Sequence, residues 1–293
     1  MPGLKDVKDK IDGVTKTSQI TQAMNMVASA KLRGAQEKME AFRPYSEKFA
    51  ETMGDLSGGM DGANLPLMEI RDVKSVEIVV VTSDRGLCGS FNAHILTTAH
   101  KLMQQYEDEG KKVSFVTVGN KAHQGLRRTG KIRAAFKDIM STFQMFNARE
   151  ISQGITENFI NGESDQVVLI YGKFHSVAVQ KPEVEELLPI KPIEQDEEAA
   201  ENKTEVSGAY IYEPDPEEIM EVLLPLYLNV QVYHAMIEVG ASEHAARMTA
   251  MDNATNACKD IIKELTQLYN KARQAAITGE LMDIVGGAEA LKG

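Results

Sequence analysis

Apolar side chains recur every three or four residues at both ends of the chain, over stretches much longer than an ordinary globular helix. The repeat runs without a slip from Leu4 to Leu56, and again from Ile219 to Met282. A sustained repeat of 3.5 residues favours a left-handed supercoil between two helices. The chain must leave the first helix, pass through the middle segment and return along the second, so the two helices are predicted to lie antiparallel.

The two predicted helices differ in length. At about 1.5 Å per residue, residues 4–56 would span about 80 Å and residues 217–285 about 100 Å, so the second helix would overshoot by about 20 Å. The overhang carries five apolar residues: Ile277, Leu281, Met282, Ile284 and Val285. Burying them would stabilise a complex by about 10 kcal/mol at most. A socket in another protein would bury this tip; the alternatives are a frayed end and a homo-oligomer seam.

Polar residues interrupt the apolar repeat in two places. On the first helix these are Ser18, Thr21 and Asn25, next to an offset apolar stripe of Ile20, Met24 and Val27; on the second helix they are Arg273, Gln274, Thr278 and Glu280. A polar layer in a coiled coil fixes the register of the two helices at some cost in stability. A polar face that slides past a moving partner is the other interpretation.

The pattern changes period in the middle of the chain. Strands are predicted at 76–83, 112–119, 165–174, 175–184 and 208–214, and helices at 91–105, 121–128 and 148–161. The first strand, VEIVVVTS, is a continuous β-branched run, as in strands buried on both faces, and 175–184 is more typical of an edge or hairpin strand. Alternating strands and helices predict a Rossmann-like α/β domain with a mostly parallel sheet.

The predicted fold class is therefore α/β plus a long antiparallel coiled coil, in which the N- and C-terminal helices form a shaft and the central segment forms a Rossmann-like α/β domain at one end of it. We divide the chain into an N-terminal shaft helix at 1–57, a linker at 58–75, an α/β foot domain at 76–213 and a C-terminal shaft helix at 214–293.

Composition narrows the class of protein. No run approaches the 18 consecutive apolar residues of a membrane span, and the N-terminus resembles neither a signal nor a transit peptide. Two cysteines give no disulfide framework, which fits a reducing cytosol. The net charge of −11 argues against nucleic acid as a partner. The most acidic segment, 194–205, is interpreted as a solvated loop.

Three motifs that might carry chemistry are better explained structurally. Residues 125–131, GLRRTGK, match the opening of a phosphate-binding loop, but Ile132 follows Lys131 where a magnesium-binding hydroxyl is needed. Cys88 lies in a tight glycine turn with His94 close in sequence, yet the turn fits no hydrolase pattern, and a small buried cysteine is the better account. The six histidines show no metal-ligand spacing. No catalytic residue, cofactor or metal is expected.

Five segments together resemble a known family. They are residues 17–36, TSQITQAMNMVASAKLRGAQ; 83–92, SDRGLCGSFN; 210–216, YIYEPDP; 242–257, SEHAARMTAMDNATNA; and 269–290, YNKARQAAITGELMDIVGGAEA. They are similar to the signatures of the gamma subunit of the F-type ATP synthase in its bacterial form. The resemblance implies a non-catalytic central-stalk rotor subunit that couples ion-driven rotation of a ring of c subunits to conformational changes at the catalytic beta subunits.

The resemblance also implies partners and contact positions. The partners would be a ring of three alpha and three beta subunits, the epsilon subunit and the c ring, with the membrane reached only through the complex, at the cytoplasmic face of the bacterial inner membrane. Met24 matches the neck where the shaft passes a moving loop of a beta subunit. Gln274, Thr278 and Glu280 match the facing part of the C-terminal helix. Arg273 with Gln274 matches a pair that engages a catch loop on beta. Residues 281–291 match a tip held in an apolar sleeve. Tyr210, Tyr212 and Glu213 match the foot surface that faces epsilon and the c ring.

Two competing hypotheses remain at this stage, an enzyme and an adaptor. A small α/β hydrolase or nucleotide-binding protein with coiled-coil arms would show activity that depends on Cys88 or Lys131. A coiled-coil adaptor unrelated to ATP synthesis would not purify with nucleotide-binding subunits.

Overall fold

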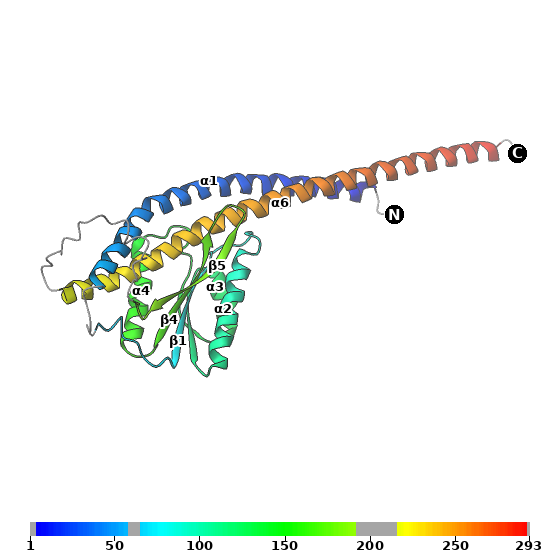
Figure 1. Cartoon of the computed structure of the whole chain (residues 1–293). Coiled ribbons are helices and arrows are strands. Elements are labelled where there is room, and N and C mark those ends of the chain that lie inside the picture. The colour runs from blue at the N-terminus through cyan, green and yellow to red at the C-terminus, as the bar shows by residue number, and fades with distance from the viewer. Residues whose placement is uncertain (1–3, 58–64, 192–215, 292–293) are drawn as a thin grey trace. The chain divides into compact units, whose positions relative to one another are not determined.

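The computed structural model describes residues 4–57, 65–191 and 216–291. The elements follow one another in this order: α1 (Leu4–Ser57), β1 (Ser75–Val81), α2 (Phe91–Asp108), β2 (Lys112–Val118), α3 (Asn120–Leu126), the 3-10 helix η1 (Arg127–Thr129), β3 (Ile132–Phe136), α4 (Met145–Ile160), β4 (Gln166–Phe174), β5 (Gln180–Leu188) and α6 (Pro216–Ala290). Along the chain, a long helix therefore precedes the α/β segment and another long helix follows it, as predicted (Figure 1).

The described chain divides into two compact units. One consists of residues 1–29 and 247–293, and the other of residues 30–246. Each long helix contributes to both units, and each unit is described in turn.

In the larger unit the five strands form one sheet in the order β3-β2-β1-β4-β5. The first four strands are parallel, and β5 returns antiparallel to β4 as a hairpin. This confirms the predicted mostly parallel, Rossmann-like sheet with an edge hairpin. The short edge strand β3 was not predicted, because its five residues include a charged Arg133 and two alanines that give no continuous β-branched run.

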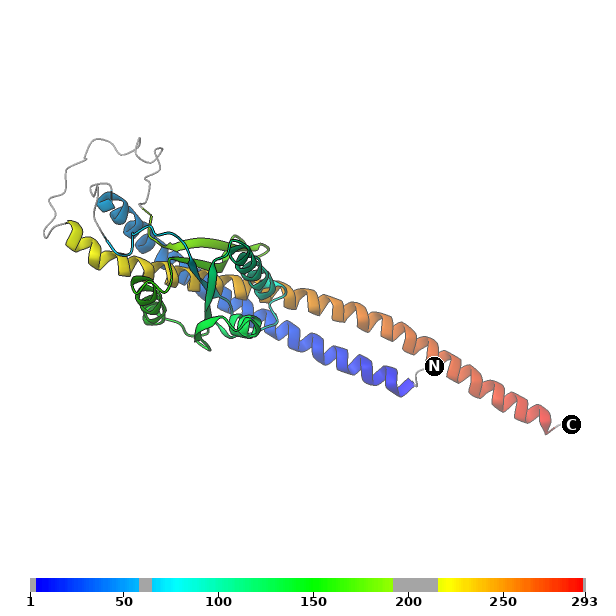
Figure 2. The ribbon, with the colours of Figure 1, turned by 90° about the horizontal axis from the view of Figure 1, so that it is seen from below.

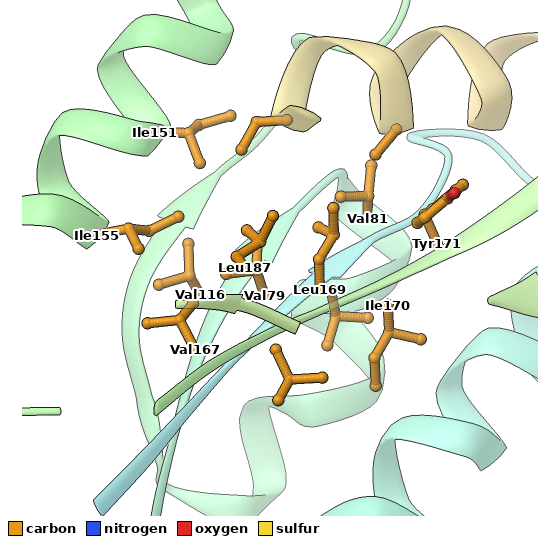
Figure 3. Close-up of a cluster of buried hydrophobic side chains, with 14 of the residues drawn as sticks. Val79, Val81, Val116, Ile151, Ile155, Val167, Leu169, Ile170, Tyr171 and Leu187 are labelled. Atoms are coloured by element: carbon orange, nitrogen blue, oxygen red, sulfur yellow. The ribbon is translucent and has the colours of Figure 1, made fainter. Parts of the chain in front are cut away.

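Helices cover both faces of this sheet. Phe91 and Ile95 of α2 lie against Gly172 of β4 on one face. On the other face, Ile151 and Ile155 of α4 point toward residues of β1, β2 and β4, with α6 passing over the same core (Figure 3). Strand β1 is buried on both sides, which explains its nearly continuous apolar run.

The C-terminal part of α1 packs against the N-terminal part of α6 within the same unit. Phe42 meets Tyr233 edge-on at 5.0 Å between ring centroids, and Phe49 stacks on Tyr227 at 6.3 Å. The later residue of α1 contacts the earlier residue of α6, so the two helices are antiparallel here, as predicted.

In the smaller unit, residues 4–29 of α1 lie beside α6 in both views (Figures 1 and 2). Every predicted seam position from Leu4 to Ala28 is buried or half-buried. On α6 the prediction was wrong at alternate positions: the buried or half-buried residues are Thr255, Ile262, Tyr269 and Ala276, whereas Ile261, Leu268 and Ala275 are exposed. Both choices give a 3.5-residue repeat, and they differ in whether the three- or the four-residue step comes first.

One described helix, α6, is long and apolar enough over Glu218–Ala290 to pass the criteria for a membrane span, which the sequence had not indicated. More than half of its most apolar stretch is buried inside the protein, so this is weak evidence for a span.

Candidate partner-contact surfaces

The polar residues of the first helix fix the register of the smaller unit. The hydroxyls of Thr21 and Thr255 are buried and lie 2.7 Å apart, and the Asn25 side-chain amide donates to the Met248 carbonyl oxygen at 2.9 Å. Thr255 also donates to the Met251 carbonyl oxygen. These groups are satisfied within the chain, which supports the register interpretation for this polar layer over a sliding surface.

An apolar stripe on α1 stays outside this seam. Ile20 is 59% exposed and Val27 is 57% exposed, while Met24 between them is half-buried. The three residues lie four and three positions apart, and therefore on one face of the helix. This stripe is one surface that a partner could cover.

The polar residues near the end of α6 have a different environment from those of α1. Arg273, Gln274, Thr278 and Glu280 are all exposed. Thr278 donates to the Gln274 carbonyl oxygen one turn earlier, so its hydroxyl is satisfied by its own helix. Spacing by four and seven residues places Gln274 with Thr278 on one face and Arg273 with Glu280 on the adjacent face.

The last turns of α6 have no cover from α1. The last half-buried position on α6 is Ala276, and every residue from Ile277 to Leu291 is exposed. The large apolar residues of this tip, between 50% and 90% exposed, are Ile277, Leu281, Met282, Ile284, Val285 and Leu291. An exposed apolar concentration of this kind marks an interaction site or an aggregation liability. The predicted apolar overhang is present in the structure.

The predicted foot residues Tyr210, Tyr212 and Glu213 lie outside the described residues, as do the strand predicted at 208–214 and the acidic segment 194–205.

Cys88 is a buried cysteine in a glycine turn, as predicted. Its thiol points to the Arg85 carbonyl oxygen at 3.9 Å, and the Asn92 amide donates to its sulfur at 3.1 Å. His94, the candidate base close in sequence, has an exposed side chain, and so has His175. A catalytic thiol needs a base in hydrogen-bond reach, and this turn provides an amide and a carbonyl.

The segment that resembles a phosphate-binding loop is not a loop. Gly125 lies in α3, where an added Cβ would meet Leu96 at 2.6 Å, and Gly130 ends η1 in a left-handed conformation. Lys131 forms an ion pair with Glu107. The backbone N–H groups that would cradle a phosphate are therefore part of a helix and its end. Within the described residues, no cluster of three or more metal-ligating side chains occurs.

Sequence reasoning missed Asp84, which organises the carboxyl-terminal edge of the sheet. Its carboxylate accepts hydrogen bonds from the backbone N–H groups of Asn120 at 2.9 Å, Asp138 at 3.1 Å and Met140 at 2.9 Å. The loops that follow β1, β2 and β3 are thereby joined. An aspartate directly after a buried strand was the available signal.

A long antiparallel helix pair with an uncovered apolar tip, joined to a Rossmann-like domain, defines a class of mechanical or scaffolding protein. Comparison with known proteins narrows this class. A model of the ATP synthase family matches residues 3–291. The ATP synthase gamma chain of Desulfotalea psychrophila is 63% identical over 292 residues, and that of Nitratidesulfovibrio vulgaris strain Hildenborough is 53% identical over 296 residues, each covering all of both chains.

Solved structures give the same result for the fold. A chain of the Tetrahymena thermophila mitochondrial ATP synthase central stalk and c ring is 25% identical, with a TM-score of 0.59, over 80% of this chain and 99% of that one. A chain of the Euglena gracilis mitochondrial ATP synthase is 20% identical, with a TM-score of 0.68, over 98% and 94% of the two chains. The chain belongs to the ATP synthase gamma-chain family.

Proposed function

We propose that this chain is the central-stalk rotor subunit of an F-type ATP synthase. It couples ion-driven rotation of a c ring to conformational changes at catalytic beta subunits, and it contributes no catalytic residue of its own. The observation that carries this proposal is the apolar tip of α6, in which every residue from Ile277 to Leu291 is exposed. Such a tip needs a surrounding protein, and a ring with an apolar sleeve provides one.

The mechanism requires an asymmetric helix pair rather than a reactive group. Each orientation of the pair presents a different surface to each of three beta subunits and stabilises one set of their conformations over the others. The coupling is a difference in binding free energy between the conformations of the beta subunits. The same chain therefore serves ATP synthesis when the c ring turns it, and ATP hydrolysis when the beta subunits turn it.

The contact residues proposed on the helices are those that the family resemblance implies, and the exposure of the four on α6 supports them. Met24, with its exposed neighbours Ile20 and Val27, faces a moving loop of a beta subunit. Gln274, Thr278 and Glu280 form the facing part of α6, and Arg273 with Gln274 engages a catch loop on beta. These four polar side chains near the end of α6 are exposed in the isolated chain and available to a partner.

The foot domain meets the membrane-embedded part of the complex. Tyr210, Tyr212 and Glu213, within a foot domain at 76–213, face the epsilon subunit and the c ring. The complex lies at the cytoplasmic face of the bacterial inner membrane, and the chain reaches the membrane only through its partners. Full-length similarity to two bacterial gamma chains supports this location.

Purification of the tagged chain from membranes tests the proposal. We expect alpha, beta and the chain in a ratio of 3:3:1, with epsilon and the c ring. A chain that purifies without nucleotide-binding subunits would identify an unrelated adaptor, and ATP or ester hydrolysis by the isolated chain that disappears in Cys88→Ala or Lys131→Ala would identify an enzyme.

Changes to the tip test the observation on which the proposal rests. Deleting residues 281–293, or replacing Leu281, Met282, Ile284 and Val285 with Gln, should weaken retention in the complex and leave the unfolding of the α/β domain unchanged. Glu289→Gln is the matched control, since Glu289 is an exposed polar residue of the same tip. Equal retention of all three chains would refute the role of the tip.

A further inference from the structure

Three polar side chains of α6 are buried in the otherwise apolar interface between this helix and the α/β domain. They are Asn229, Glu238 and Ser242, at most 8% exposed. Around them α6 contributes apolar residues such as Leu228, Val232, Met236 and Val239 to the core. A polar group buried in such an interface costs free energy unless it is hydrogen-bonded, so the partners of these three side chains matter.

Each of the three side chains hydrogen bonds to a different point of the α/β domain. Ser152 of α4 donates to the Asn229 side-chain oxygen. The backbone N–H of Phe174, at the end of β4, donates to the Glu238 carboxylate at 2.7 Å. Ser242 donates to the Gly172 carbonyl oxygen of β4 at 3.0 Å. All these residues belong to the larger compact unit.

The three contacts hold two opposite sides of α6. Asn229 and Glu238 are nine residues apart, which is about 2.5 helical turns, so their side chains leave the helix on opposite sides. Ser242 follows Glu238 by four residues and lies on the same side as Glu238. One side of α6 is thus tied to α4, and the other side, about 14 Å further along the axis, is tied to β4.

Contacts of this kind resist rotation of α6 about its own axis better than apolar packing does. Burial of apolar area is non-directional, so a helix can roll or slide while it keeps much of that area buried. A buried hydrogen bond weakens steeply with misalignment, and it leaves an unsatisfied group when it breaks. Bonds on two sides of the helix oppose a roll in either direction.

We propose that Asn229, Glu238 and Ser242 lock α6 to the α/β domain and transmit torque between the domain and the helix pair. This inference rests on the proposed rotor function and adds to it the residues at which a turning force passes from one part of the chain to the other. The three are positioning residues that touch no nucleotide. Without them, part of the imposed rotation is lost as a roll of α6 within its own domain.

The test compares ion transport with ATP hydrolysis in the complete membrane complex. In inverted membrane vesicles, ATP-driven membrane potential is followed with an oxonol dye, which responds whether the transported ion is H⁺ or Na⁺. For the variant Asn229→Leu/Glu238→Met/Ser242→Ala, we expect the ratio of transport to hydrolysis to fall by at least about twofold, while hydrolysis continues. Glu238→Gln keeps an acceptor for the Phe174 N–H and should retain the wild-type ratio. Glu221→Gln, an exposed change of the same type on α6, is the matched control.

A covalent substitute separates torque transmission from a folding defect. Ser152 and Asn229 are in direct side-chain contact, so Ser152→Cys/Asn229→Cys can be cross-linked in a background with Glu238→Met, Ser242→Ala, Cys88→Ala and Cys258→Ala. In the oxidised complex, the ratio of transport to hydrolysis should approach that of an uncross-linked control with Cys88→Ala and Cys258→Ala alone. After reduction of the same complex, this ratio should fall again. Both states are measured on one assembled protein.

Equal transport ratios in the oxidised and reduced forms, or a wild-type ratio in the triple variant, would overturn the lock. A wild-type complex that lacks the ring subunits, or that produces no ATP-driven potential, would instead refute the proposed function.

Discussion

Thr21 of α1 and Thr255 of α6 join their buried hydroxyls at 2.7 Å, although 234 residues separate them in the chain. The contact lies where the apolar repeat of the first helix is interrupted. Two small hydroxyls can approach closely only when the helices have one relative register. The pair therefore fixes the alignment of the two helices in this unit.

Replacing these hydroxyls should show strong non-additivity. Thr21→Val or Thr255→Val alone should lower the free energy of unfolding by about 1 kcal/mol, because the hydrogen bond between the helices is lost and the remaining hydroxyl keeps only a carbonyl oxygen of its own helix. The double variant should lose less than the sum, since the same inter-helix hydrogen bond is removed only once. Urea unfolding followed by circular dichroism measures both effects. Additive losses would show that the hydroxyls do not interact in solution.

Glu77 and Arg133 form a second polar contact, within the sheet, in which the glutamate is buried and the arginine side chain is 33% exposed. Glu77 on β1 is fully buried, and Arg133 on β3 donates to both of its carboxylate oxygens, one of them at 3.1 Å. Desolvation raises the pKa of the Glu77 carboxyl, and the Arg133 guanidinium opposes this. Arg133→Met should cost about 1–3 kcal/mol of unfolding free energy, because the buried Glu77 carboxylate then keeps only the weaker hydrogen bond from Asn158.

The loss in Arg133→Met should depend on pH with a definite sign. Without the guanidinium the folded-state pKa of Glu77 rises further, so the folded variant holds a proton that the unfolded chain releases. The variant's deficit should therefore be small below the ordinary glutamate pKa, and it should grow as pH rises toward the folded-state pKa. Unfolding free energies measured from pH 4 to pH 8 test this, and a deficit independent of pH would contradict it.

Asp165 should show the opposite dependence. Burial works to raise the pKa of its carboxyl, but hydrogen bonds from the Lys74 and Ser75 N–H groups and from the Ser75 hydroxyl, with the charge of Arg71, outweigh burial and hold the pKa below its usual value. Its contribution to stability is thus present above the unfolded-state pKa and lost as pH falls through the folded-state pKa. Asp165→Asn should be less stable than the wild type at pH 6, and the gap should narrow with acidification below pH 4. A gap that widens on acidification would show that this assignment is wrong.

Substitution of Arg273 and Gln274 should affect the activity of the complex without affecting the stability of the chain. Both side chains are exposed, so Arg273→Ala/Gln274→Ala should change the unfolding free energy of the chain by less than about 0.5 kcal/mol. The same change should slow ATP hydrolysis by the assembled complex, because it would remove the proposed contact with the catch loop on beta. Asn270→Ala/Lys271→Ala, two exposed neighbours on α6, is the control. Equal rates in both double variants would remove these residues from the contact surface.

Elements whose burial repeats along the chain could be predicted from the sequence, and contacts between distant segments could not. The long repeats specify two paired helices, and the continuous run of β1 specifies a buried strand, because burial imposes these patterns along the chain itself. Strand β3 and the α6 residues Asn229, Glu238 and Ser242 were not predicted. Their roles depend on contacts with segments distant in sequence, which no local period records. The seam after Cys258 was misplaced at alternate positions for the same reason, since only the partner helix decides between neighbours.

The predicted contact residues divide along similar lines. Exposure of Arg273, Gln274, Thr278 and Glu280 agrees with a surface that meets a partner, while burial of Thr21 assigns part of the polar pattern to the helix pair itself. A sequence shows where polar groups interrupt a seam. It does not show which of them find partners inside the chain.

Rotation of the chain inside its complex is the central claim, and it can be observed directly. The ring subunits are fixed to a surface, a nanorod is attached to a cysteine at the exposed position 94 of the α/β domain, and ATP is added. We predict stepwise rotation in one direction with three equivalent resting angles, one for each beta subunit. Sustained ATP hydrolysis by single complexes whose nanorods do not turn would contradict it.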